Sequence, residues 1–163
     1  KMLDISKASL KQLIGLALRS EIDSNKVYSR LAARVSNPLL KEKFEWLAYE
    51  ENKHKKILEK LSGTLFKGER VKIPEKTDKA LLPSVNIVPS SSLADILYQA
   101  MESEKSAENF YALFSRRVDN PQKKMLVYLS KVEHSHYRML ESEYAMALEF
   151  EDYAEKDIDK VIT

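Results

Sequence analysis

The sequence contains two Glu-x-x-His motifs, Glu51 to His54 and Glu133 to His136, within segments rich in helix-forming residues. Side chains three residues apart lie on one face of a helix, so each motif can offer a carboxylate and an imidazole to one metal ion. The chain has no cysteine, which excludes disulfides, thiolate metal sites and iron-sulfur clusters. Any metal must therefore be bound through oxygen and nitrogen.

An internal repeat supplies further carboxylates. The segment Arg34 to Pro38 recurs as Arg117 to Pro121, 83 residues later. The apolar stripe around Glu21 recurs around Glu104 with the same offset, and the two Glu-x-x-His motifs are 82 residues apart. Each of the four stripes is thus interrupted by a glutamate. A carboxylate that faces a helical core is unfavourable unless it is protonated, paired or bound to a metal.

The elements that must position these groups are predicted to be helical throughout. The three glycines and five prolines lie almost entirely between long stretches of helix formers. We expect one domain, 1–163, with an all-α fold. Its expected parts are helices at 7–35, 39–62, 92–118 and 122–148, paired as hairpins 7–62 and 92–148, a long crossover at 63–91, and an acidic C-terminal extension at 149–163. Two similar hairpins should pack as a four-helix bundle around a pseudo-twofold axis.

The glutamates are predicted to meet at one depth of this bundle. Glu21 and Glu51 each lie about 15 residues from the first turn, roughly 22 Å along the helix, and the other pair lies at a similar distance from the second turn. Four carboxylates carry about four negative charges, which two divalent cations would balance, with neutral imidazoles completing the coordination. The predicted metal ligands are Glu21, Glu51, His54, Glu104, Glu133 and His136.

This ligand pattern resembles that of the ferritin-like di-iron carboxylate proteins. The segments that carry the resemblance are Glu21 to Tyr28, Glu51-Asn52-Lys53-His54, Glu104 to Tyr111 and Glu133-His134-Ser135-His136, and they are most similar to rubrerythrins. The resemblance implies a ferritin-like bundle that binds two iron ions, or alternatively manganese. It also implies an oxidoreductase that reduces peroxide or oxidises ferrous iron with oxygen, with a role in oxidative stress.

The sequence departs from the rubrerythrin pattern in two places and from the bacterioferritin pattern in one. Without cysteine there is no rubredoxin domain, so electrons must come from a separate donor protein. Ala107 stands where rubrerythrins carry an additional glutamate, and Glu108, one residue further on, is a weak substitute. Asn52 stands where the similar bacterioferritins carry their haem-binding methionine, so no haem is expected.

Other residues near the motifs have less specific roles. Tyr28 and Tyr111 are either ordinary core aromatics or, as the resemblance implies, donors of a hydroxyl hydrogen bond to a ligand carboxylate. His134 points away from His136 on the helix and should lie on the surface. Trp46 and Met101 are predicted to be core residues.

Charge and hydropathy exclude several classes of function. A net charge of +2 gives no reason to expect nucleic acid, and Lys53, Lys55 and Lys56 are expected to form a solvated face. The chain has neither a run of eighteen apolar residues nor an apolar signal core, so we expect a cytoplasmic protein without membrane contact. A homodimer or higher homo-oligomer is expected. An iron-storage protein, a manganese catalase-like enzyme and an interaction module with a degenerate site remain alternatives.

Overall fold

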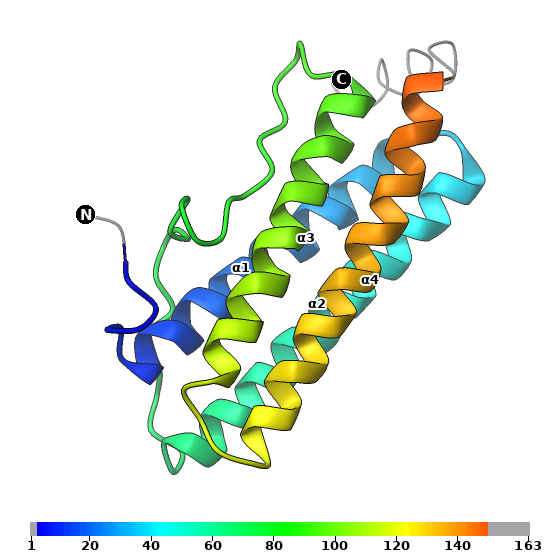
Figure 1. Cartoon of the computed structure of the whole chain (residues 1–163). Coiled ribbons are helices and arrows are strands. Elements are labelled where there is room, and N and C mark those ends of the chain that lie inside the picture. Colours follow the sequence, from blue (N-terminus) through cyan, green and yellow to red (C-terminus); the bar gives the residue numbers. More distant parts are fainter. Residues whose placement is uncertain (1–2, 150–163) are drawn as a thin grey trace.

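The structure is a computed structural model, in which residues 3–149 are described. This part of the chain contains four α-helices and no strand, so the predicted all-α class is confirmed (Figure 1). The helices are α1 (Leu10–Arg34), α2 (Pro38–Leu65), α3 (Leu93–Ser115) and α4 (Gln122–Glu149). None of these described helices combines the length and the apolar character needed to cross a membrane. The predicted extension at 149–163 lies outside the described residues, apart from Glu149 at the end of α4.

Serine caps set where α1 and α3 begin. The Ser9 hydroxyl accepts a hydrogen bond from the backbone N–H of Gln12 at 3.1 Å, and the Gln12 side chain accepts one from the backbone N–H of Ser9 at 2.9 Å. Ser92 and Asp95 form the same reciprocal pair. Because this arrangement satisfies N–H groups that lack a partner within the helix, α1 begins at Leu10 rather than at residue 7.

Two helix ends differ from the prediction. Gly63 was expected to open the crossover, but α2 runs through it to Leu65, because a glycine weakens a helix without breaking it. In contrast, α3 ends at Ser115 rather than at residue 118. We call residues 66–92, which join α2 to α3, the crossover from here on.

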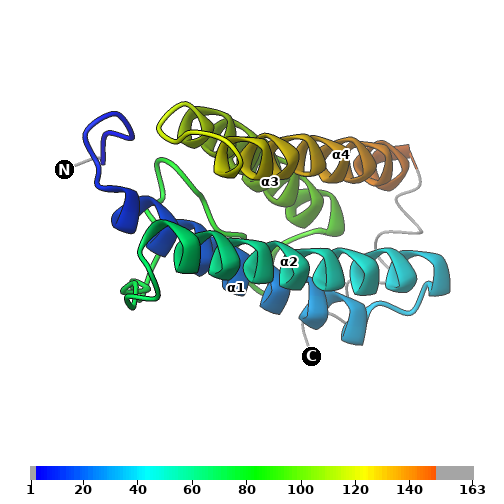
Figure 2. The ribbon, with the colours of Figure 1, turned by 90° about the horizontal axis from the view of Figure 1, so that it is seen from below.

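The four helices form two hairpins that pack face to face. Figure 2 shows α1 with α2 in one layer and α3 with α4 in the other. Each hairpin is closely paired along its length, and α2 also meets α4 across the two layers. The tight turn between α1 and α2 is fixed by Asn37, whose side chain accepts hydrogen bonds from the backbone N–H groups of Leu39 and Leu40, both at 3.0 Å.

The buried apolar core is divided into two clusters at opposite ends of the bundle. One cluster lies at the end of the α1–α2 turn and includes Tyr28, Phe44 and Leu97. The other lies at the far end and includes Leu13 and Phe110, with further residues from α2 and α4. The glutamates and histidines of the motifs lie in a polar layer between these two clusters. Each end of this polar layer is therefore closed by packed apolar side chains.

The crossover is anchored to α1 and α3. Ser103 on α3 donates a hydrogen bond to the carbonyl oxygen of Pro83 at 2.9 Å, and the side chain of Leu82 is buried. At Gly15 on α1 the crossover approaches so closely that a Cβ atom would collide with the carbonyl oxygen of Lys72 and lie 3.5 Å from Pro74. Glycine is required there because backbone occupies the space of a side chain.

Replacement of Gly15 should therefore loosen the crossover. We expect Gly15→Ala to lower the free energy of unfolding by about 1–3 kcal/mol, as in other overpacked sites. Gly63→Ala is the matched control, because no atom lies within 4 Å of a Cβ there, and it should raise stability by about 0.5–1 kcal/mol. Urea unfolding followed by circular dichroism measures both, and equal effects of the two variants would contradict the close approach.

Candidate metal centre

The structure brings all six predicted ligands together in the polar layer between the two apolar clusters. The six residues are each at most 3% exposed. They form two groups, and within each group one potential ligand atom per residue lies within 4.8 Å of the others. The groups are Glu21, Glu51, His54 and Glu133, and Glu51, Glu104, Glu133 and His136.

The two groups distinguish shared glutamates from unshared ones, a distinction that the sequence did not provide. Glu51 and Glu133, from α2 and α4, belong to both groups, whereas Glu21 and Glu104, from α1 and α3, belong to one group each. The geometry thus offers two four-residue positions that share two carboxylates. A shared carboxylate has two oxygen atoms and can contact both positions at once.

The two histidine rings face the carboxylates with their Nδ1 atoms. His54 Nδ1 lies 3.0 Å from Glu133 Oε1 and 3.5 Å from Glu21 Oε2. His136 Nδ1 lies 3.1 Å from both Glu51 Oε1 and Glu133 Oε2. The rings stack nearly parallel, with centroids 5.3 Å apart. Since each Nδ1 approaches carboxylates from both hairpins, the histidines lie where the two layers meet.

Burial and charge oppose each other strongly in this cluster. Burial, together with repulsion from Glu133 and Glu104, raises the pKa of Glu51 well above its usual range. Burial also raises the pKa of Glu133 to about 7, although His54 opposes that shift. Burial disfavours the charged form of His54, but Glu133 and Glu21 outweigh it and raise its pKa to about 12. Without a cation, these shifts favour the protonated forms of Glu51, Glu133 and His54.

Several of these buried polar atoms lack a hydrogen-bond partner. They are Glu21 Oε2, Glu51 Oε1, Glu133 Oε1, both ring nitrogens of His54 and Nε2 of His136. The short Nδ1–oxygen approaches lie within ion-pairing distance, but not all have hydrogen-bond geometry. Native proteins rarely leave such atoms unpaired. Carboxylate oxygen and imidazole nitrogen are ligands for divalent transition metals, so the residues present fit two such ions.

Two tyrosines link the hairpins through the outer carboxylates. The Tyr28 hydroxyl on α1 donates a hydrogen bond to Glu104 on α3, and the Tyr111 hydroxyl on α3 donates one to Glu21 on α1. Of the two interpretations of these residues, the hydroxyl hydrogen bond is thus the one that the structure shows. Burial, followed by the nearby carboxylates, raises the pKa of both tyrosines well above the usual range, so both remain protonated donors.

The predicted positions of the neighbouring residues were partly wrong. Met101 is buried as expected, but Trp46 is 43% exposed, and its ring packs edge-on against His136 with centroids 5.4 Å apart. His134 lies on the surface as expected, within 3.2 Å of Glu108. Since Glu108 also pairs with Lys105, it points away from the cluster and is no substitute ligand.

Sequence reasoning missed Glu50, which is buried beside the centre. Its side chain pairs with Lys53 at 2.5 Å, and one of its oxygens lies within 4.8 Å of ring nitrogens of His54 and His136. No periodic signal distinguished Glu50 from an exposed glutamate, because it lies next to Glu51 and off the apolar stripe. Its burial depends on how α2 meets α4.

A four-helix bundle that buries two overlapping carboxylate-histidine groups defines the ferritin-like class. A hypothetical protein from Pyrococcus furiosus has a similar structure, with a TM-score of 0.80 and 32% sequence identity over 91% of this chain and 98% of that chain. Residues 12–156 match the family model of rubrerythrin. The chain therefore belongs to the rubrerythrin family, whose members bind a di-iron centre. No curated protein matches it.

A substitution at a shared carboxylate tests whether the residue binds metal, and it also tests what the buried carboxyl group costs in stability. We expect divalent metal to raise the melting temperature of the wild type, because a ligand present at a hundred times its dissociation constant adds about 2.7 kcal/mol. Glu51→Gln should lose this gain, yet melt no lower than the wild type without metal, because glutamine replaces a carboxyl group whose ionised form is costly to bury.

The matched control is Glu45→Gln, at an exposed position of the same helix. It should keep the wild-type response to metal. Differential scanning calorimetry with and without metal measures all three proteins, and a full metal-dependent gain in Glu51→Gln would remove Glu51 from the centre.

Proposed function

We propose that this protein is a di-iron oxidoreductase that reduces peroxide, oxidises ferrous iron, or both. The observation that carries the proposal is the pair of four-residue groups that share Glu51 and Glu133. Two groups that share two carboxylates support a proposal of two ions rather than one. A ferrous pair would supply the two electrons that, with two protons, convert one peroxide molecule into two water molecules.

Iron is proposed on the strength of family membership, because oxygen and nitrogen ligands do not by themselves distinguish iron from manganese. Electrons for repeated turnover are proposed to come from a separate donor protein, since the sequence has no cysteine with which to build a rubredoxin-type centre. We also propose that the protein acts as a homo-oligomer.

The surrounding residues have definite tasks in this function. Tyr28 and Tyr111 hold the outer carboxylates in place and keep their own protons, so each fixes one oxygen of its partner. The apolar clusters close both ends of the polar layer and keep bulk water out. Exclusion of water strengthens every charge interaction within the site.

Anaerobic loading tests the proposed redox function. The protein should take up two ferrous ions per chain, and one equivalent of hydrogen peroxide should then produce ferric absorption. Glu133→Gln should bind less iron and show little of this absorption. Wild-type protein that binds two ions but remains ferrous after peroxide would contradict the proposed redox function, while the metal centre itself would stand.

Tryptophan fluorescence gives an independent measure of loading. Trp46 is the single tryptophan of the sequence and contacts the ring of His136. Iron with unpaired electrons should quench its emission in proportion to occupancy, whereas closed-shell zinc should quench it much less. Emission that does not change while two irons bind per chain would place the metal away from His136.

A further inference from the structure

Glu50 is a buried carboxylate that belongs to neither of the two four-residue groups. The residue is only 7% exposed and lies on α2 directly before Glu51. One of its oxygens lies within 4.8 Å of a ring nitrogen of His54 and of a ring nitrogen of His136, and those two nitrogens lie within the same distance of each other. Since a carboxylate is costly to bury without a partner, its place beside both histidines indicates an interaction with them.

Each histidine ring has a nitrogen that the carboxylates of the two groups do not satisfy. The Nδ1 atoms face those carboxylates, at 3.0 Å for His54 and 3.1 Å for His136, so Nδ1 is the nitrogen available to a metal ion. A neutral imidazole that binds metal through Nδ1 keeps its hydrogen on Nε2. Nε2 of both rings is buried and lacks a hydrogen-bond partner. Two buried N–H groups therefore need an acceptor.

Glu50 lies within reach of this task. A separation of up to 4.8 Å is longer than a direct hydrogen bond, but a small rotation of the side chain closes it or one water molecule bridges it. A carboxylate has two oxygens and can accept from two donors at once. The corresponding position of the second half of the chain is Val132, which has no polar side chain. One acid would thus serve both rings.

Two neighbours on α2 restrict where the Glu50 carboxylate can lie. Lys53, three residues further along the helix, pairs with it at 2.5 Å, and the Lys53 side chain is partly exposed. Trp46, four residues before Glu50 and so on the same face of the helix, packs edge-on against the ring of His136. The carboxylate is therefore placed between a lysine at the surface and the buried histidine rings.

We propose that Glu50 is a positioning residue of the metal centre, which accepts the Nε2–H hydrogen bonds of both His54 and His136. The proposal rests on the two-metal centre of the function proposed above, and not on its redox chemistry. An anionic acceptor at Nε2 fixes the orientation of each ring, keeps Nδ1 directed at the metal position and makes the imidazole a stronger ligand. Loss of such a partner typically lowers metal affinity about ten- to a hundredfold.

Zinc-loaded protein tests this role, because zinc has no redox chemistry and leaves magnetic resonance spectra sharp. The Nε2–H groups of His54 and His136 should give two slowly exchanging proton resonances, whereas exposed His134 should exchange rapidly with solvent. Glu50→Gln keeps an acceptor oxygen without the charge, so it should shift both resonances. Glu50→Leu removes the acceptor and should shift them further. Zinc affinity, measured by competition with a chelator, should fall about tenfold in Glu50→Gln and more in Glu50→Leu.

Two control variants separate this role from a purely structural one. Glu45→Gln, at an exposed position of the same helix, should change neither the resonances nor the zinc affinity. Lys53→Gln removes the charged partner of Glu50 but leaves its carboxylate in place, so it should retain most of the affinity. A residue needed only for packing would change the unfolding curve of the protein without moving the two histidine resonances.

The outcomes distinguish this proposal from the proposed redox function. If zinc occupies both positions and Glu50→Leu changes neither the resonances nor the affinity, Glu50 has no positioning role; should that variant not fold, the same result in Glu50→Gln decides. A crystal structure of the loaded protein with a Glu50 oxygen coordinated to an ion would make Glu50 a ligand and would also overturn the proposal. A ferrous protein that peroxide does not oxidise would contradict the redox function alone.

Discussion

The mutual repulsion of four buried carboxylates is the constraint on which the rest of this structure depends. Glu21, Glu51, Glu104 and Glu133 meet at one level of the bundle, where little solvent can screen them. Two tyrosine hydroxyls satisfy one oxygen of each outer carboxylate, and the imidazoles face the shared ones. These partners leave several buried oxygens and nitrogens unpaired, and cations are the groups that can satisfy them together.

The fold and the six converging residues could be predicted because apolar residues recur at helical spacing in the sequence and the glutamates interrupt that pattern. A glutamate that interrupts an apolar stripe stands out within a single helix, and its recurrence as Glu104 after Glu21 gives the same signal twice. Trp46 and Glu50 carried no such signal. Trp46 was expected in the core but is half-exposed, and Glu50 is buried although it lies off the stripe. Both outcomes depend on how α2 meets α4, which the pattern of one helix does not determine.

The internal repeat makes the ligands of the centre nearly symmetric, but the residues around them differ between the two halves. The ligands and the two tyrosines recur in both halves, but the position that corresponds to Glu50 in the second half is Val132, and Ser24 corresponds to Ala107. Glu50 therefore lies close to His54 and His136 without a counterpart in the second half. Ser24 lines the cavity between α1, α3 and the crossover, also without a counterpart hydroxyl. The two metal positions share their ligand types but not their neighbours, so they need not be chemically equivalent.

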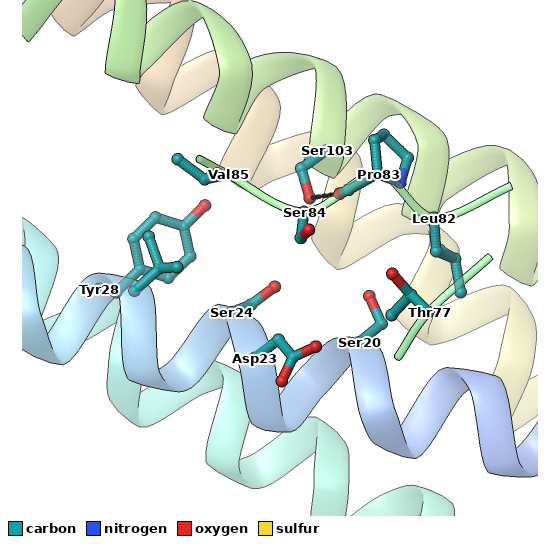
Figure 3. A pocket seen from close by; sticks show the side chains of 11 residues that line it. Ser20, Asp23, Ser24, Tyr28, Thr77, Leu82, Pro83, Ser84, Val85 and Ser103 are labelled. Atoms are coloured by element: carbon teal, nitrogen blue, oxygen red, sulfur yellow. Dashed lines mark hydrogen bonds between the residues drawn. The ribbon is translucent and has the colours of Figure 1, made fainter. Parts of the chain in front are cut away.

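Topology explains why the two sides of the centre differ. The end of α2 packs in the far apolar cluster, whereas α3 begins in the cluster near the first turn, so the connection between them must return along the bundle. That distance is roughly 35 Å for a helix of the length of α3, which only a long segment can span. The returning chain packs against α1 at Gly15 and against α3 at Ser103. The same connection that makes two antiparallel hairpins into one bundle thus also forms one wall of the small cavity between α1, α3 and the crossover (Figure 3).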